Sequence, residues 1–351
     1  MREGGRSGVW ADRLSFGMIS ARRSGRSPAS PRGAERGVRS TGVGQVILTV
    51  TLNTALDLTY RVPALTPHAS HRVTQVIERP GGKGLNVARV LAALGHETVA
   101  TGFAGGATGA TLRELLAPTS VRDELVETAG TTRRTVAVVD TATGDTTQLN
   151  EPGPAVTAAE WTAFRSRFAE LLHGARAVAL CGSLPPGIHV GAYAELVRLA
   201  RAAAVPVLLD TSGEPLRRGI AARPDLVKPN ADELAHLTGS REPRRATHDA
   251  RRRGAHAVIS SLGPEGLLAA TPDGLWRAAP PAPVRGNPTG AGDSAVAGLL
   301  AGLVEGLPWP DRLARAVALS AATVLSPVAG EFDTAAYEEL LPRVKVTEEA
   351  P

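Results

Sequence analysis

The feature that most restricts the fold is the alternation of short apolar runs with longer helical patterns from residue 157 onward. Runs such as "AVALCG", "VPVLLD" and "AVISSLG" are too short for helices, and segments with helical spacing separate them. Strands that alternate with helices imply right-handed βαβ units and a parallel central sheet. The sequence therefore predicts an α/β fold whose ligand site lies beyond the carboxyl ends of the strands.

The earlier part of the chain shows a second pattern. Residues 46–52 predict a buried strand, and residues 86–95 have helical spacing that ends at a glycine. Residues 57–78 and 133–150 instead alternate polar and apolar side chains, which is typical of strands with one exposed face. We expect these alternating stretches to form a small sheet that stands apart from the main core.

The C-terminal part completes the expected domain. It predicts a hairpin over "GLLAATPDGLWRA" and, after it, helices over 291–306, 308–326 and 333–343. The domain is expected to span residues 45–345, with residues 346–351 as a tail.

The formal charge of +5 is unevenly distributed. Residues 1–44 contain nine Arg and three acidic residues, a net +6, which leaves −1 for residues 45–351. The basic segment is rich in Arg, Ser, Gly and Pro and lacks periodicity, so we expect it to be disordered. It suits a targeting peptide or a nucleic-acid arm less well than an extended translation start, because a strand begins directly afterwards. The charge of the remainder argues against a nucleic-acid-binding protein.

Other residue classes exclude several functions. Since no apolar run reaches the length of a membrane span, the sequence predicts a soluble, cytoplasmic protein without a membrane partner. The single cysteine, Cys181, excludes an internal disulfide, and its apolar setting favours a small hydrophobic residue over a reactive thiol. His68 and His71 lack further metal ligands nearby, and the mixed charges of 240–254 predict a solvated helix face.

A glycine-rich turn, 286–295 ("GNPTGAGDSA"), precedes an apolar segment that predicts a buried helix. Gly290 and Gly292 allow backbone N–H groups to converge, and the helix beginning there adds the positive end of its dipole. Asp293 beside a bound phosphate would accept a proton from an incoming hydroxyl while the amides stabilise the transferred group. Taken alone, the same residues also suit a glycine-rich cap with Asp293 as the N-cap residue.

Two further segments carry candidate ligands. "RPGGKGLN" (79–86) is a second glycine-rich loop before a helix, where backbone amides can approach a sugar; a plain tight turn explains it equally well. "KPNADEL" (228–234) places Asn230 and Glu233 on one face of a helix's first turn. This amide and carboxylate suit a hydrated Mg²⁺ ion, although an ordinary helix start has the same pattern.

Seven motifs together resemble the successive signatures of the PfkB, or ribokinase-like, carbohydrate kinases. They occur in the family's order between about Val46 and Val344: "TLNTALD", "GGKGLNVARVLAALG", "GSLPPG", "LDTSGE", "VKPNADEL", "ISSLGPEGLL" and "TGAGDSAVAGLL". The resemblance is greatest to the branch that contains 1-phosphofructokinase, tagatose-6-phosphate kinase and the minor 6-phosphofructokinase. It implies a three-layer α/β/α sandwich with a central, mostly parallel sheet and a small β-sheet lid.

The resemblance also implies roles for individual residues. Asp293 corresponds to the catalytic base, and the anion hole corresponds to Gly290, Ala291 and Gly292. The positions that match the sugar site are Asp57, Gly81, Gly82, Lys83 and Asn86. Those that match the nucleotide site are Lys228, Asn230, Glu233, Ser261, Gly263 and Gly266, with Glu233 also bound to Mg²⁺ through water.

The activity implied by the resemblance is an ATP- and Mg²⁺-dependent phosphorylation of a sugar phosphate, first of all fructose 1-phosphate at O6. Arg133 matches an arginine that binds the acceptor's existing phosphate in this branch, and a guanidinium fork suits a phosphate. Tagatose 6-phosphate and fructose 6-phosphate are the nearest alternative substrates. A nucleoside or neutral-sugar kinase and a catalytically silent sugar-phosphate sensor are more distant alternatives.

Three positions depart from the family's pattern. Thr54 stands where the branch commonly has Pro, Thr135 where it has Asn, and Pro288 precedes Thr289 where many members have Thr-Val. The first and third concern loop stiffness, whereas Thr135 lies on the substrate side and leaves the choice among sugar phosphates open. Because lids pair in relatives, the resemblance also implies a homodimer through the lid.

Overall fold

The computed structural model describes residues 46–326 and 330–349. The described residues all belong to one compact unit, which lies within Gly42–Pro351. The expectation of disorder over residues 1–44 therefore lies outside the described part. Every helix within that part is too short or too polar to cross a membrane.

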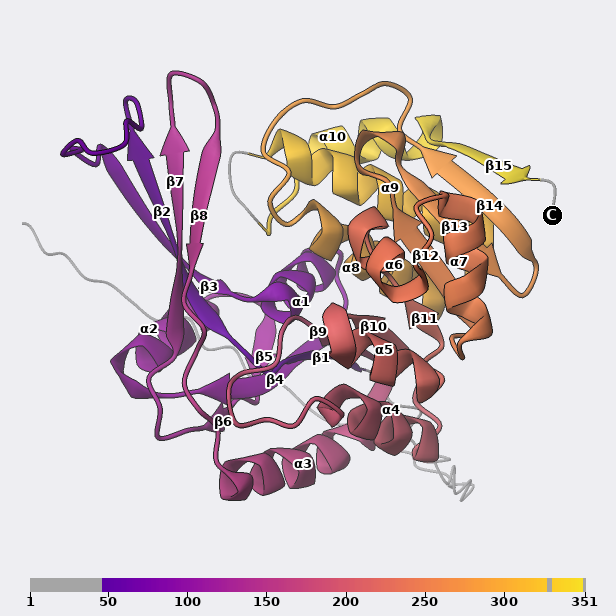
Figure 1. Cartoon of the computed structure of the whole chain (residues 1–351), viewed down its shortest axis with the longest axis horizontal. Helices are drawn as coiled ribbons and strands as arrows, with labels where there is room; N and C mark the ends of the chain where they lie inside the picture. Colours follow the sequence, from indigo (N-terminus) through magenta and orange to yellow (C-terminus); the bar gives the residue numbers. More distant parts are fainter. Residues whose placement is uncertain (1–45, 327–329, 350–351) are drawn as a thin grey trace, which may run out of the picture. The chain divides into compact units, whose positions relative to one another are not determined.

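A main sheet of eleven strands forms the centre of the described structure (Figure 1). Its order is β15-β14-β13-β12-β11-β10-β9-β1-β4-β5, and β6 also pairs with β4. The strands are β1 Val46–Thr51, β4 Thr98–Ala104, β5 Val121–Asp123, β6 Val126–Glu127, β9 Ala175–Cys181, β10 Val207–Asp210, β11 Leu226–Val227, β12 Ala257–Ser261, β13 Leu267–Thr271, β14 Gly274–Ala279 and β15 Lys345–Glu349. Neighbours from β5 to β12 are parallel, and the pairs from β12 to β15 are antiparallel.

Helices cover both faces of the main sheet, which confirms the expected three layers. In β1, Val46, Leu48 and Val50 pack into one apolar cluster while Ile47 packs into the other, as the two-residue period of a strand requires. The first cluster contains side chains of α3 Ala158–Leu172, α4 Ala192–Ala202, α5 Gly213–Ala221, α6 Ala231–Thr238 and α7 Pro243–Arg252. The second contains side chains of α1 Lys83–Ala93, α8 Ala291–Val304 and α9 Trp309–Leu325, with α10 Thr334–Leu340 packed against it.

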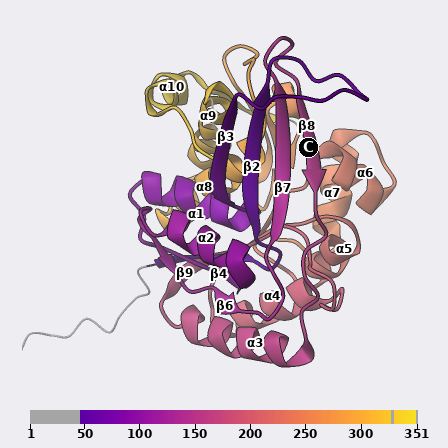
Figure 2. The same cartoon turned by 90° about the vertical axis from the view of Figure 1, so that its left-hand side faces the viewer.

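The alternating stretches form a separate four-stranded sheet, called the lid below. Its strands are β2 Ala55–Val62, β3 Gln75–Gly81, β7 Arg133–Asp140 and β8 Thr146–Asn150. Figure 2 shows them side by side in the order β3-β2-β7-β8. Apolar side chains on the lid remain in contact with solvent, since Val76 is 54% exposed and Leu149 is 60% exposed.

The C-terminal residues correct one predicted boundary. Residues 346–351 were expected to form a tail, but Lys345–Glu349 form β15, which pairs antiparallel with β14. Val346 packs against the second apolar cluster, so this strand shares the core of the domain. The predicted helix 333–343 is also shorter, because α10 ends at Leu340 and a 3₁₀ turn, Leu341–Arg343, follows it with proline inside.

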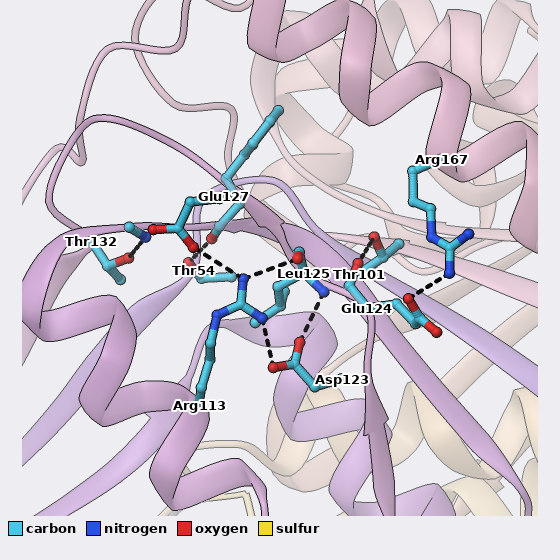
Figure 3. Close-up of polar contacts among 11 residues, drawn as sticks. Thr54, Thr101, Arg113, Asp123, Glu124, Leu125, Glu127, Thr132 and Arg167 are labelled. Carbon is cyan, nitrogen blue, oxygen red and sulfur yellow. Dashed lines mark hydrogen bonds and ion pairs between the residues drawn. The ribbon is translucent and has the colours of Figure 1, made fainter.

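The helix α2 Gly106–Leu116 has no counterpart among the predicted elements. Its Arg113 joins it to the short strands at the edge of the sheet, as Figure 3 shows. The guanidinium donates to the Asp123 carboxylate at 2.6 Å and to the Leu125 carbonyl at 3.0 Å. In the same view the Thr54 hydroxyl donates to the Phe103 carbonyl, so this loop is held to β4 where the family commonly has proline.

Candidate active site

The predicted site lies at the carboxyl ends of the parallel strands. Asp210 ends β10, Lys228 directly follows β11, and Ser261 ends β12, and these three strands are neighbours in the sheet. Parallel strands bring their carboxyl ends to one edge, so residues far apart in the sequence meet there. The start of α8 faces the same edge, because the Lys228 amine lies 3.6 Å from where a Cβ on Gly292 would stand.

Asp293 occupies the first turn of α8. The N-cap residue of this helix is Gly290, with φ of 85° and no side-chain cap, so Asp293 does not serve as the N-cap. Its side chain is 7% exposed and accepts a hydrogen bond of 2.8 Å from Asn86 Nδ2. The structure therefore joins the start of α8 to the helix that follows the diglycine loop.

Burial raises the pKa of Asp293 to about 6, and the nearby Asp210 carboxylate acts in the same direction. Lys83, the hydrogen bond from Asn86, and Lys228 oppose this shift. A carboxylate in this range is deprotonated at neutral pH and is a stronger proton acceptor than an ordinary aspartate.

Two lysines share the buried carboxylate of Asp210. Lys83 Nζ lies 3.4 Å from both carboxylate oxygens, and Lys228 Nζ lies 3.6 Å from Oδ1. Asp210 first of all, and more weakly Asp293 and Glu233, raise the pKa of Lys83, which keeps this amine charged. Asp210 was missing from the predicted site residues, although its motif "LDTSGE" ends a predicted strand and contained the signal.

The three amides predicted to form the anion hole are not equally available in this structure. The Ala291 N–H donates to the Pro288 carbonyl at 3.1 Å, so this amide is engaged within its own turn. Among the described contacts, the amides of Gly290 and Gly292 have no acceptor. Two of the three predicted amides, together with the Lys228 amine, therefore remain available to an anion at this helix start.

On the lid side, Asp57 stands at the centre of three adjoining strands. Its neighbours across the sheet are Arg79 on β3 and Thr135 on β7, and the Thr135 hydroxyl donates to Asp57 Oδ1. A Cβ on Gly81 would lie 2.1 Å from Asp57 Cγ, so only glycine leaves room for this carboxylate. Burial raises the pKa of Asp57 despite the Thr135 hydrogen bond. Gly82, with φ of 102°, is the N-cap residue of α1.

Arg133 lies at the base of the lid, where β7 begins. Its Nε donates to the Asn53 carbonyl and its Nη1 to the Glu151 carbonyl, each at 3.2 Å. These bonds fix the side chain and leave Nη2 without a hydrogen bond among the described contacts. The adjacent Arg134 instead forms a salt bridge of 2.9 Å with Glu151 on the exposed side of the strand.

The predicted nucleotide residues gather in two neighbouring loops. Asn230 and Ser261 form an isolated parallel bridge, and the Ser261 N–H donates to the Pro229 carbonyl at 3.0 Å. Asn230 and Glu233 form a reciprocal capping box at the start of α6, with both bonds at 2.8 Å. The ordinary helix start considered for this motif is therefore present, and it occupies one oxygen of each side chain.

The loop after β12 depends on its glycines. Gly263 and Gly266 both have positive φ, 61° and 86°. A Cβ on Gly266 would lie 2.1 Å from the Ala278 carbonyl oxygen, so the turn is restricted to glycine. This loop follows Ser261, which pairs with Asn230, and therefore lies beside the 228–230 segment.

Cavity size alone does not identify the site. A cavity of about 280 Å³ lies between the lid and the loop before α8, and its lining includes Asp57, Arg79 and Thr289. A larger hollow of about 590 Å³ lies near the amino ends of β11 and β12, and it contains none of the predicted site residues. The coupled charges at the carboxyl ends are the more specific indication.

A buried carboxylate at an uncapped helix start, two lysines at the carboxyl ends of a parallel sheet, and a small β-sheet lid agree with the expected class of sugar kinase. Residues 49–335 match the pfkB family of carbohydrate kinases, and the chain belongs to this family. It is therefore a phosphotransferase that acts on a hydroxyl group, with a ribokinase-like α/β fold.

Individual relatives indicate which members of this family the chain resembles. The chain is 42% identical to the 1-phosphofructokinase of Rhodobacter capsulatus over 289 residues, which cover 80% of this chain and 92% of the relative. It is 31% identical to the tagatose-6-phosphate kinase of Staphylococcus epidermidis over 315 residues, or 86% and 100% of the two chains. The structure of Escherichia coli phosphofructokinase-2 in complex with fructose-6-phosphate aligns with a TM-score of 0.78 and 32% identity, covering 84% of this chain and 98% of that one.

Proposed function

We propose that this protein transfers the γ-phosphoryl group of ATP to O6 of fructose 1-phosphate, forming fructose 1,6-bisphosphate and ADP. The observation that carries the proposal is the buried Asp293 carboxylate, held by Asn86 beside free amides at the start of α8. The 42% identity to a 1-phosphofructokinase supports fructose 1-phosphate as the first candidate.

The chemistry follows from the groups at this helix start. Asp293 accepts the proton of the 6-hydroxyl as the oxygen bonds to the γ-phosphorus, and the bond from this phosphorus to the bridging oxygen of ADP breaks. The amides of Gly290 and Gly292 and the Lys228 amine stabilise the negative charge on the transferred group. Lys83, held against Asp210, adds a second cation at the same edge of the sheet.

The acidic residues at this edge would also suit a Mg²⁺ ion. Within residues 46–326 and 330–349, no three acidic, histidine or cysteine side chains are arranged to hold a metal ion by themselves. Glu233 uses Oε2 in its capping box and keeps Oε1 for a water ligand of the ion. When bound, Mg²⁺ would neutralise charge on the β- and γ-phosphates.

Arg133 and Asp57 would select the acceptor. The fixed Arg133 guanidinium offers Nη2 to the phosphate that the sugar already carries, and Asp57 accepts hydrogen bonds from sugar hydroxyls. A sugar hydroxyl at Asp57 must share this carboxylate with Thr135, which replaces the family's asparagine.

We also propose that two copies of the chain pair through their lids. The exposed apolar side chains Val76 and Leu149 lie on the outer lid strands β3 and β8 and would be covered by such contact. A structure of Escherichia coli phosphofructokinase-2 described as tetrameric and inhibited aligns with this chain at a TM-score of 0.78, so assembly beyond a monomer occurs in the family.

The test is ADP release with fructose 1-phosphate, fructose 6-phosphate, tagatose 6-phosphate and unphosphorylated fructose, each with ATP and Mg²⁺. We expect the highest kcat/KM for fructose 1-phosphate and identification of the product as the 1,6-bisphosphate by ³¹P NMR. A preference for tagatose 6-phosphate or fructose 6-phosphate would support the kinase activity but contradict fructose 1-phosphate as the substrate. Absence of ADP release with every sugar would favour a sensor.

A further inference from the structure

We infer that Arg89 is a positioning residue for phosphoryl transfer: it fixes the side-chain amide of Asn86 in the one orientation that donates a hydrogen bond to Asp293. This inference rests on the proposed role of Asp293 as the base.

Arg89 and Asn86 lie three residues apart on α1, so their side chains share one face of the helix. Arg89 Nη2 donates to Asn86 Oδ1 at 2.9 Å, and Asn86 Nδ2 donates to Asp293 Oδ2 at 2.8 Å. The two bonds form a chain from the guanidinium through the amide to the carboxylate. Asn86 is buried, so water has little access to the middle of this chain.

The chain determines which way the amide faces. A rotation of about 180° exchanges the oxygen and the nitrogen of an asparagine amide with almost no change of shape. The rotated amide would place Oδ1 against the Asp293 carboxylate, so that two acceptors would face each other. A guanidinium can only donate, and therefore Arg89 keeps Oδ1 on its own side and Nδ2 toward Asp293.

The surroundings of Arg89 hold it in this position. Burial first of all, and then the neighbouring Arg79, lower the pKa of Arg89, while the carboxylates of Glu331, Asp57 and Asp293 favour the charged guanidinium. Gly330 packs directly over the contact, since a Cβ there would lie 2.2 Å from Arg89 Nη2 and 2.6 Å from Asn86 Oδ1. The backbone after α9 therefore closes over this hydrogen bond and leaves room for no other side chain.

The test is a double-mutant cycle of Arg89→Met and Asn86→Ala, with kcat and both KM values measured for ATP and fructose 1-phosphate. If Arg89 acts through Asn86, we expect R89M to lower kcat by about 10-fold and to leave KM for ATP within about twofold. In the N86A background, R89M should then change kcat by less than about twofold. Multiplicative losses in the double variant would overturn the inference.

Arg113→Met is the matched control, because Arg113 is likewise a helix arginine that donates to buried or half-buried oxygens, here those of Asp123 and Leu125 (Figure 3), and none of its described hydrogen bonds reaches a predicted site residue. It should lower stability with kcat unchanged, and a loss of kcat equal to that of R89M would also overturn the inference.

Should R89M be too unstable to assay, Arg89→Lys replaces it in the cycle. We expect R89K alone to lower kcat by about threefold and to have no effect in the N86A background. Full activity of N86A would refute the proposed site itself, whatever the outcome at Arg89.

Discussion

The two ends of the parallel strands differ in how their charges are held. At the carboxyl ends, Asp210 and Asp293 are buried and interact with Lys83 and Lys228. At the amino ends of β11 and β12, the larger hollow is lined by arginines and histidines that lie near the surface. The second region has more charged groups and more volume, yet the residues that the sequence motifs predict for the site lie at the first.

The direction of the helices explains why the charged side chains at the two ends of the strands are held differently. The helices α4, α5 and α7 end beside the hollow, where their last carbonyls carry negative partial charge. Arginines there bond these carbonyls and the loops behind them: Arg201 donates to Ala222 at 3.1 Å and Arg251 to His256 at 2.9 Å. Such contacts cap the helices, whereas at the start of α8 the amides of Gly290 and Gly292 have no acceptor among the described contacts. Buried, paired charged side chains are therefore a better indication of a functional site than a larger number of charged side chains near the surface.

The largest expected effect concerns the two carboxylates Asp293 and Asp225. Asp293→Asn should lower kcat by about 10³- to 10⁴-fold, because the amide cannot accept the proton of the sugar hydroxyl. Asp225→Asn is the control at the amino ends, where the carboxylate accepts one hydrogen bond among the described contacts, from the Val207 N–H at 2.8 Å. We expect turnover of this control to match the wild type in the ADP-release assay. Similar kcat values for the two variants would remove the distinction between the two regions.

The neighbours Arg133 and Arg134 provide the next comparison. Arg133→Met should raise KM for fructose 1-phosphate by about 10- to 100-fold and leave KM for ATP unchanged, because a charged hydrogen bond to the phosphate is lost. Arg134→Met removes only the exposed salt bridge to Glu151 and should leave both KM values unchanged. An unchanged KM in R133M would favour an acceptor without a phosphate.

Asp210→Asn tests whether the two lysines depend on their shared carboxylate. The substitution leaves Lys83 and the buried Lys228 as like charges without this partner. We expect kcat/KM for ATP to fall by about 10-fold and the free energy of unfolding to fall by about 2–4 kcal/mol. Both are measured on one preparation, by ADP release and by urea unfolding. Unchanged kinetics with lowered stability would restrict Asp210 to a structural role.

The smallest effect is expected at the amino ends. Arg223 has φ of 65°, in the left-handed region that favours glycine. Arg223→Gly should raise the free energy of unfolding by about 0.5–1 kcal/mol without a change in kcat. Arg198→Gly, within the exposed face of α4, should instead lower it by about 1 kcal/mol. A loss of activity in R223G would mean that the hollow takes part in function.

Much of the fold was predictable because local patterns agreed with tertiary packing. The alternating strands and helices after residue 157 required a parallel sheet, and its carboxyl edge followed from strand direction. The helix α2 was missed because "GATGATLRELL" contains glycines, with Gly106 at φ of 65° and no side-chain cap. The strand β15 was missed because its pairing with β14 joins residues about 70 positions apart, which no local pattern shows.

The site was predictable only in part, because some of its residues depend on contacts with distant parts of the chain. The glycine-rich turns and Asp293 carry local signals, and the structure places them on one edge of the sheet. Asp210 lies in a motif at the end of a predicted strand, but its pairing with two lysines, which reach it from α1 and from the end of β11, cannot be read from that motif. The orientation of Asn86 depends on Arg89 and Asp293 together, which requires side-chain geometry.

The most direct test of the account is a titration of Asp293 itself. In protein labelled with ¹³C at aspartate side-chain carboxyls, the resonance that is absent from the D293N variant belongs to this residue. We predict that it titrates near pH 6, because burial outweighs the nearby lysines. Since only the deprotonated form accepts a proton, kcat should fall on the acid side of this value. Titration at the ordinary aspartate value of 3.8 would contradict the account, because burial would then not outweigh the nearby lysines and the carboxylate would not be adapted as a base.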